Sequence, residues 1–270
     1  MLYFIPTPIG NIEDLSKRSL NILKIADVAL CEDTRVTKKL IGILQERFDI
    51  KINIKKFISL HSHNEKRVLQ SLDKNIFDQT VVYMSDAGMP CISDPGSFLV
   101  KYAQENNIKY EVLPGANAAV TSFASSGFEE KEFLFFGFLP HKGSERKKAL
   151  NEVLNSSYNT ILYEAPHRIK KLLEEISLIE PNREVFVQKE ISKVHQKWYK
   201  NSAKIIKETL NNENLKGEWV VIIKGEKKKH KSISKEDIIN ANISNKQKAK
   251  LLAKITDKSI KEWYDELINT

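Results

Sequence analysis

The chain has 270 residues, of which 41% are apolar and 29% charged, a balance typical of an ordinary soluble globular protein. No apolar run approaches the ~20 residues that a membrane span needs, and no basic-then-apolar leader precedes the first strand-like segment, so we expect a cytoplasmic protein. The net charge of +8 fits a polyanionic partner such as RNA. Only seven of the 43 basic residues are Arg, however, and a compositional drift towards Lys, Asn and Ile would give the same excess.

In its first half, as in the rest of the chain, short apolar runs alternate with longer stretches of helical periodicity, a pattern that predicts βα units and a mainly parallel sheet. Continuously apolar strands are typical of a sheet that is covered on both faces. The predicted strands are Leu2–Ile5, Val28–Cys31, Phe57–His61, Val81–Met84 and Tyr110–Leu113. The predicted helices are Ser16–Ala26, Thr34–Arg47, Asn64–Phe77 and Gly96–Asn107.

The pattern restarts after Pro114, where we place a domain boundary. The predicted helices of this second half are Asn117–Ser126, Ser144–Asn155, His167–Ile179 and Ser202–Asn211. Its predicted strands are Phe133–Leu139, Thr160–Tyr163, Glu184–Ile191 and Trp219–Lys224. The fold class is therefore two consecutive α/β domains, 1–114 and 115–226, with a small helical C-terminal appendage over 234–270.

A run of Lys at 227, 228, 229 and 231 predicts a linker before the appendage. Two short helices with apolar faces, Lys246–Ile255 and Ser259–Ile268, could then pack as a helix-turn-helix, with Asp257 between them as a cap. Residues 226–270 hold eleven Lys against seven acidic residues, a net charge of +4. The appendage is either an auxiliary RNA anchor or a solvated helical hairpin that stiffens the C-terminus.

Three loops at predicted strand ends are rich in small residues, and ligands of parallel α/β sheets gather at the carboxyl ends of strands. They are TPIGN at 7–11, SDAGMPCISDPG at 85–96 and PGANAAV at 114–120. Small residues let the backbone approach a ligand closely, although a rigid turn or a loop with Asx-turns has a similar composition. Neither the GxGxxG nor the GxxxxGK[ST] pattern is present, which argues against a Rossmann dinucleotide site and a P-loop.

Polar clusters follow three further strands: CEDTR at 31–35, HSHNE at 61–65 and YEAPHR at 163–168. Each could be a helix cap with a solvated charge pair. Because all three follow strands, we expect them to form one polar rim, which favours a ligand-binding site over separate helix caps.

Cys31 and Cys91 lie too far apart for metal-ligand spacing, and without a Cys/His cluster we expect reduced, packed thiols and no metal.

These segments, together with GFLP at 137–140 and KGE at 216–218, closely resemble in order the ribosomal RNA methyltransferases of the tetrapyrrole methylase-like superfamily. The resemblance covers roughly residues 1–225 and extends more weakly to the tail. Met89 departs from it, because the family loop usually has Thr there. The resemblance implies two α/β domains, S-adenosylmethionine as methyl donor between them, and a homodimer. It also implies methylation of a cytidine ribose 2′-oxygen in the decoding centre of small-subunit (16S) rRNA, either free or in the assembled subunit.

The resemblance also suggests residue roles. The expected donor contacts are Ile9, Ser85, Asp86, Ala87, Met89, Asn117, Ala118, Leu139, Tyr163 and Gly217. From the chemistry of the reaction, we expect His63 or Glu65 as general base and Asn64 to orient the ribose. Alternatively, His63 caps the next helix and the enzyme relies on alignment of the substrates without a dedicated base. Glu32 and Arg35 would position one another and a backbone phosphate. The expected RNA contacts are Arg168, Lys142, Arg146, Lys147 and Lys148.

Two other functions compete with this interpretation. One is a methylase of the same superfamily that acts on a tetrapyrrole or on the modified histidine of a translation elongation factor. The other is a non-catalytic RNA-binding accessory protein. Binding of S-adenosylmethionine distinguishes the accessory protein from either enzyme, because a bound ligand stabilises the native state.

Overall fold

The computed structural model describes residues 1–226 and 234–269, and the chain divides into two compact units, Met1–Glu226 and Lys227–Thr270. The predicted Lys-rich linker at 227–231 lies outside the described residues. Within them, no helix is both long and apolar enough to cross a bilayer.

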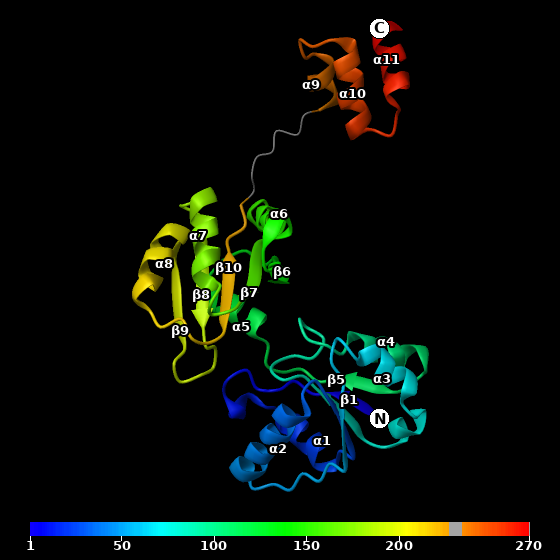
Figure 1. The fold of residues 1–270 in the computed structure, drawn as a ribbon, viewed down its shortest axis with the longest axis vertical. Coiled ribbons are helices and arrows are strands. Elements are labelled where there is room, and N and C mark those ends of the chain that lie inside the picture. Colours follow the sequence, from blue (N-terminus) through cyan, green and yellow to red (C-terminus); the bar gives the residue numbers. More distant parts are fainter. Residues whose placement is uncertain (227–233, 270) are drawn as a thin grey trace. The chain divides into compact units, whose positions relative to one another are not determined.

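The first sheet has five parallel strands in the order β3-β2-β4-β1-β5. Figure 1 shows β1 beside its partner β5 in this sheet. Its strands are β1 (Leu2–Phe4), β2 (Val28–Cys31), β3 (Lys56–Ser59), β4 (Val81–Met84) and β5 (Tyr110–Val112). This confirms the predicted strands and their parallel arrangement. All five carboxyl ends consequently lie along one edge, where the loops after β1, β4 and β5 meet.

Two layers of helices bury the faces of this sheet. Helices α1 (Lys17–Ile25) and α2 (Thr34–Phe48) share one core cluster with the sheet. Helices α3 (Glu65–Ser71) and α4 (Ser97–Glu105) belong to the opposite cluster. The short 3₁₀ helices η1 and η2 span Ile12–Asp14 and Lys74–Asp78.

The single helix predicted over 64–77 is wrong, because the chain leaves the α-helical path after Ser71. Leu72 is extended, and the Asp73 side chain accepts a hydrogen bond from the Asn75 N–H at 3.0 Å. This bond starts a separate 3₁₀ turn and offers the backbone an alternative to a continuous helix.

The second sheet has the order β6-β7-β10-β8-β9 and is mixed. Its strands are β6 (Phe133–Phe138), β7 (Asn159–Glu164), β8 (Glu184–Lys189), β9 (Lys197–Ser202) and β10 (Trp219–Ile223). Only β6 and β7 are parallel to each other, and the remaining pairs are antiparallel. The mainly parallel sheet predicted for this half is therefore wrong. Strand β9 was not predicted, because it is an edge strand of sequence KWYKNS without a buried residue.

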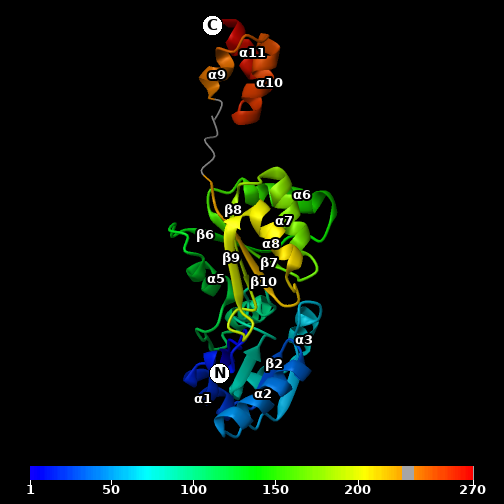
Figure 2. The ribbon, with the colours of Figure 1, turned by 90° about the vertical axis from the view of Figure 1, so that its left-hand side faces the viewer.

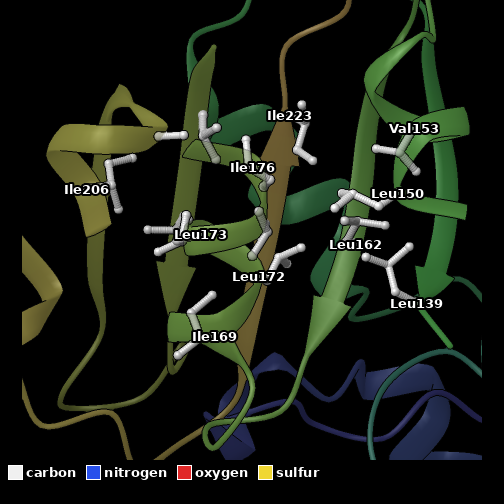
Figure 3. Packing of buried hydrophobic residues seen from close by; sticks show 14 of the residues in the cluster. Leu139, Leu150, Val153, Leu162, Ile169, Leu172, Leu173, Ile176, Ile206 and Ile223 are labelled. Atoms are coloured by element: carbon white, nitrogen blue, oxygen red, sulfur yellow. The ribbon is translucent and has the colours of Figure 1, made fainter. Parts of the chain in front are cut away.

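Helices α6 (Gly143–Leu154), α7 (Ile169–Ile179) and α8 (Ala203–Thr209) cover one face of this sheet, and α5 (Ala118–Ser126) packs on the other (Figure 2). A third 3₁₀ helix, η3, spans Leu210–Asn212. Alternate β10 residues serve the two faces: Val221 and Ile223 face α6–α8, whereas Val220 and Ile222 face α5. Figure 3 shows Leu172, Leu173 and Ile176 of α7 packed against the strands.

The C-terminal unit contains α9 (Lys235–Ile239), α10 (Asn245–Ile255) and α11 (Ile260–Asn269). The last two helices were predicted, whereas α9 was not. The small core of this C-terminal unit contains Ile238, Leu252 and Trp263. Ser259, rather than the predicted Asp257, caps α11, because it exchanges hydrogen bonds with Glu262 through both backbone and side chain.

Arg183 is a buried polar hub of the second half, with a relative exposure of 2%. Its guanidinium donates to the carbonyl oxygens of Leu154 and Lys224, both at 2.8 Å, and pairs with Glu180. It thereby joins the carboxyl ends of α6, α7 and β10.

We predict that Arg183→Ala lowers the free energy of unfolding by about 3 kcal/mol, because it removes two buried hydrogen bonds to carbonyls and the ion pair with Glu180. Chemical denaturation measures the change. Arg47→Ala is the matched control, since Arg47 makes an exposed pair with Glu13 whose loss costs about 1 kcal/mol or less. Equal effects of the two substitutions would contradict the hub role.

Candidate active site

The loops after β1 and β4 are joined directly at the carboxyl edge of the first sheet. Thr7 and Gly88 exchange backbone hydrogen bonds of 2.9 and 3.1 Å, and the Thr7 hydroxyl donates to the Ser85 carbonyl at 3.2 Å. Gly88 has a φ of +84°, a conformation that favours glycine. The two small-residue loops therefore form one structure rather than two separate turns.

The loop after β1 also contacts the second half of the unit. A Cβ built on Gly10 would lie 2.5 Å from the Ile191 carbonyl oxygen, so this approach requires glycine. Close by, the Ser192 hydroxyl donates a hydrogen bond to the Asp14 carboxylate. Backbone and side chain thus fix the first loop against the segment that follows β8.

A cavity of about 380 Å³ lies where these loops meet the second sheet. The loops after β1, β4 and β5 supply one wall, and β6, β7, β10 and the segment after β8 supply the other. Its lining residues are Ile9, Ala87, Gly88, Met89, Ile92, Ser93, Asp94, Asn117, Ala118, Phe138, Tyr163, Glu164, Ala165, Pro166, Ile191, Glu218, Trp219 and Val220. The wall is mainly apolar, with a few polar groups that could orient a ligand.

Six of the ten residues predicted to contact the donor line this cavity: Ile9, Ala87, Met89, Asn117, Ala118 and Tyr163. Ser85, Asp86, Leu139 and Gly217 do not line it. Asp86 instead binds the neighbouring loop, where its carboxylate accepts from the Asp33 N–H and its own N–H donates to Glu32, both at 3.2 Å. Gly217, with a φ of +119°, packs against Glu190.

Tyr163 connects the second sheet to the N-terminus of α5. Its hydroxyl is hydrogen-bonded to the Ala119 backbone, and burial raises the pKa of the phenol to about 12. The rings of Phe135 and Phe138 contact it edge-on, with centroids 5.1 and 5.6 Å away. Tyr163 is therefore a fixed, protonated part of the cavity wall.

Asp94 also lines the cavity, although nothing in the sequence pattern singles it out. Burial, with the nearby Glu32 carboxylate, raises its pKa to about 7, although the Ser85 hydroxyl partly opposes this shift. In the sequence, Asp94 belongs to the segment SDPG, directly before α4. This composition is typical of a turn, so it does not indicate a cavity residue.

Glu164, at the end of β7, is held by two arginines. It pairs with Arg168 at 2.9 Å and with Arg146 at 3.6 Å. The same guanidiniums donate to the carbonyls of Leu139 at 2.7 Å and Pro140 at 3.2 Å. The two arginines therefore connect Glu164 to the loop after β6 and hold that loop beside the cavity.

This arrangement corrects two expected RNA contacts. The side chains of Arg146 and Arg168 are 3% and 15% exposed, so their guanidiniums serve buried carboxylates and carbonyls instead of phosphates. The other three expected contacts, Lys142, Lys147 and Lys148, are exposed at the start and along the first turns of α6.

The polar rim also differs in detail from the expectation. Arg35 pairs with Asp33 at 2.6 Å, which holds the pKa of that carboxyl at about 2, and does not pair with Glu32 as expected. Glu32 instead accepts the Asp86 N–H. Burial is the main cause of the raised pKa of Glu32.

Neither His63, Asn64 nor Glu65 lines the cavity. Glu65 is buried and accepts the N–H groups of Gly96 and Leu99 at the start of α4, at 3.1 and 3.3 Å, and burial raises its pKa. The Asn64 amide bonds the backbone of residues 59 and 61, and His63 is exposed. Asn64 and Glu65 thus have structural partners already. In residues 1–226 and 234–269, no His, Cys, Asp and Glu side chains form a group that could hold a metal ion.

Comparisons with curated proteins identify close relatives. Ribosomal RNA small subunit methyltransferase I of Campylobacter fetus is 50% identical over 270 residues, covering 99% of this chain and all of the relative. The protein of the same name from Helicobacter pylori strain J99 is 40% identical over 277 residues, covering 98% and 96%. The one from Halalkalibacterium halodurans is 40% identical over 225 residues, covering 83% and 75%.

Solved structures share the fold at low sequence identity. A cobalt precorrin-4 methyltransferase of cobalamin biosynthesis has a TM-score of 0.59 at 15% identity, covering 83% of this chain and 94% of its own. Uroporphyrin III C-methyltransferase from Thermus thermophilus has a TM-score of 0.58 at 14% identity, covering 82% and 96%. The family model described as Tetrapyrrole (Corrin/Porphyrin) Methylases matches residues 1–206. The chain therefore belongs to the tetrapyrrole methylase family of S-adenosylmethionine-dependent methyltransferases and, within it, to the ribosomal RNA small subunit methyltransferase I group.

Proposed function

We propose that the chain transfers the methyl group of S-adenosylmethionine to the ribose 2′-oxygen of a cytidine in the decoding centre of small-subunit rRNA. The main support is the full-length relative at 50% identity, whose name states its rRNA substrate. An rRNA substrate also supports residence in the cytoplasm. The acceptor is either the free rRNA or the assembled small subunit.

The cavity between the two sheets suits the donor in size and chemistry. Its volume of about 380 Å³ lies in the range of small-molecule sites. Ile9, Ala118 and Tyr163 offer apolar surface for an adenine ring, whereas Asn117 and Gly88 bring backbone groups to the wall. When bound, S-adenosylmethionine supplies an electrophilic methyl group.

We assign the binding of the RNA backbone to exposed groups outside the cavity. Arg35, whose side chain is 89% exposed, and the exposed His63 would contact RNA. Lys142, Lys147 and Lys148 would bind phosphates. The Lys-rich C-terminal unit is proposed as a second RNA anchor. A homodimer also belongs to the proposal, and the exposed Leu134 on edge strand β6 and Val120 on α5 provide apolar surface for it.

The proposed reaction predicts labelled methyl transfer from S-adenosylmethionine to one cytidine when the enzyme is incubated with 16S rRNA or small subunits. Mapping the modified nucleotide in each substrate identifies both the site and the preferred form. Labelling of a protein or a tetrapyrrole without labelling of rRNA would overturn the proposed substrate.

The donor assignment predicts that Ala87→Leu weakens S-adenosylmethionine binding about tenfold or more, which corresponds to about 1.4 kcal/mol. Ala87 lines the cavity and is exposed, so a larger side chain occupies ligand space with little effect on the core. Calorimetry measures the dissociation constant. Ala124→Leu, the same change at an exposed position of α5 away from the cavity, should bind normally. Equal affinities of the two variants would contradict the assignment.

The RNA assignment predicts that joint replacement of Lys142, Lys147 and Lys148 by Ala weakens rRNA binding and flattens its salt dependence by about 2 in log–log slope. Each lost phosphate contact removes released counterions, while the donor cavity stays intact. Binding is measured between about 50 and 200 mM salt. The control replaces three exposed lysines of the first half, Lys24, Lys51 and Lys109. A salt slope unchanged relative to this control would remove α6 from the RNA surface.

A further inference from the structure

Four titratable side chains line the donor cavity: Asp94, Tyr163, Glu164 and Glu218. Three of them are poorly suited to accept a proton, because one is already protonated and two are held in ion pairs. Tyr163 stays protonated near neutral pH because its pKa is about 12. Glu164 is held in ion pairs by Arg168 and Arg146. Glu218 pairs with Lys193 at 2.8 Å on the exposed side of the wall.

Asp94 is different, because no Lys or Arg of the described residues forms an ion pair with it and the charges that act on it are acidic. The Ser85 hydroxyl is its polar neighbour. It is half-buried and comes from the same loop as Ala87 and Met89, so it lies in the wall of the cavity itself. The titratable groups within electrostatic reach are Glu32, Tyr83, Asp86, Cys91 and Tyr163.

We propose that Asp94 is the catalytic base of methyl transfer, a role that rests on the proposed ribose substrate. The 2′-oxygen forms a bond to the methyl carbon of the donor substrate, and the bond between that carbon and sulfur breaks. The electron pair of the broken bond stays on sulfur, which becomes an uncharged thioether. The hydroxyl proton passes to the Asp94 carboxylate and then to solvent.

The electrostatics of the loop suit this role. A base works best when its pKa lies near the operating pH, and burial together with Glu32 brings the Asp94 pKa to about 7. An ordinary exposed aspartate would be a much weaker base. Because the raised pKa leaves Asp94 protonated in acid, the rate of methyl transfer should fall as the pH drops below about 7.

The test is Asp94→Asn, which keeps the shape of the side chain and removes its ability to accept the proton. Single-turnover methylation of rRNA at saturating donor should slow about 100-fold or more and lose its rise between about pH 6 and pH 8. The dissociation constant for S-adenosylmethionine, measured by calorimetry without RNA, should stay within about threefold. Asp49→Asn, the same change at an exposed residue at the end of α2, should retain the rate and its pH dependence.

Two results would overturn the proposal while wild-type enzyme still methylates rRNA. In one, Asp94→Asn retains the wild-type rate and pH profile. In the other, it loses donor affinity more than tenfold but keeps the pH-dependent rate at saturating donor, which would make Asp94 a donor contact only. If wild-type enzyme binds donor and leaves rRNA unmethylated, the proposed substrate fails instead. Thermal unfolding of each variant confirms that the compared proteins are folded.

Discussion

The cavity between the loops of the first sheet and the second sheet depends on the close backbone approach at Gly10. A side chain there would collide with the Ile191 carbonyl and push the loop after β1 away from the second sheet. The same loop is bonded to Gly88, so its position sets that of the long loop after β4. Close packing transmits such a shift, because protein interiors have little free volume to absorb it. One glycine contact thus holds the loops at the edge of the first sheet against the second half of the unit.

Charge is divided between the cavity and the outer surface. Glu32, Asp86 and Asp94 concentrate negative charge around the carboxyl edge of the first sheet, although the chain as a whole carries +8. The lysines of α6 lie on the surface, where they can attract a polyanion without entering the cavity.

Local pattern predicted most elements, because buried strands such as Val28–Cys31 and Val81–Met84 are short apolar runs with clear breaks. Edge strand β9 escaped detection, since one polar strand at the margin of a sheet has neither an apolar run nor strict alternation. The small-residue composition of the loops predicted many of the residues that line the cavity. It could not reveal Asp94 as a wall residue or Arg146 as buried, because both depend on which distant side chains pack beside them.

The chain has only seven arginines, and their positions show which of them the fold needs. Arg146, Arg168 and Arg183 are the ones that enter the interior, and each divides its planar fork between a carboxylate and at least one backbone carbonyl. A lysine ammonium has no such geometry and is more costly to strip of water. Exposed arginines such as Arg18 and Arg47 each pair with a single carboxylate, a contact that a lysine can also make. The interior three are therefore the arginines that the fold itself requires.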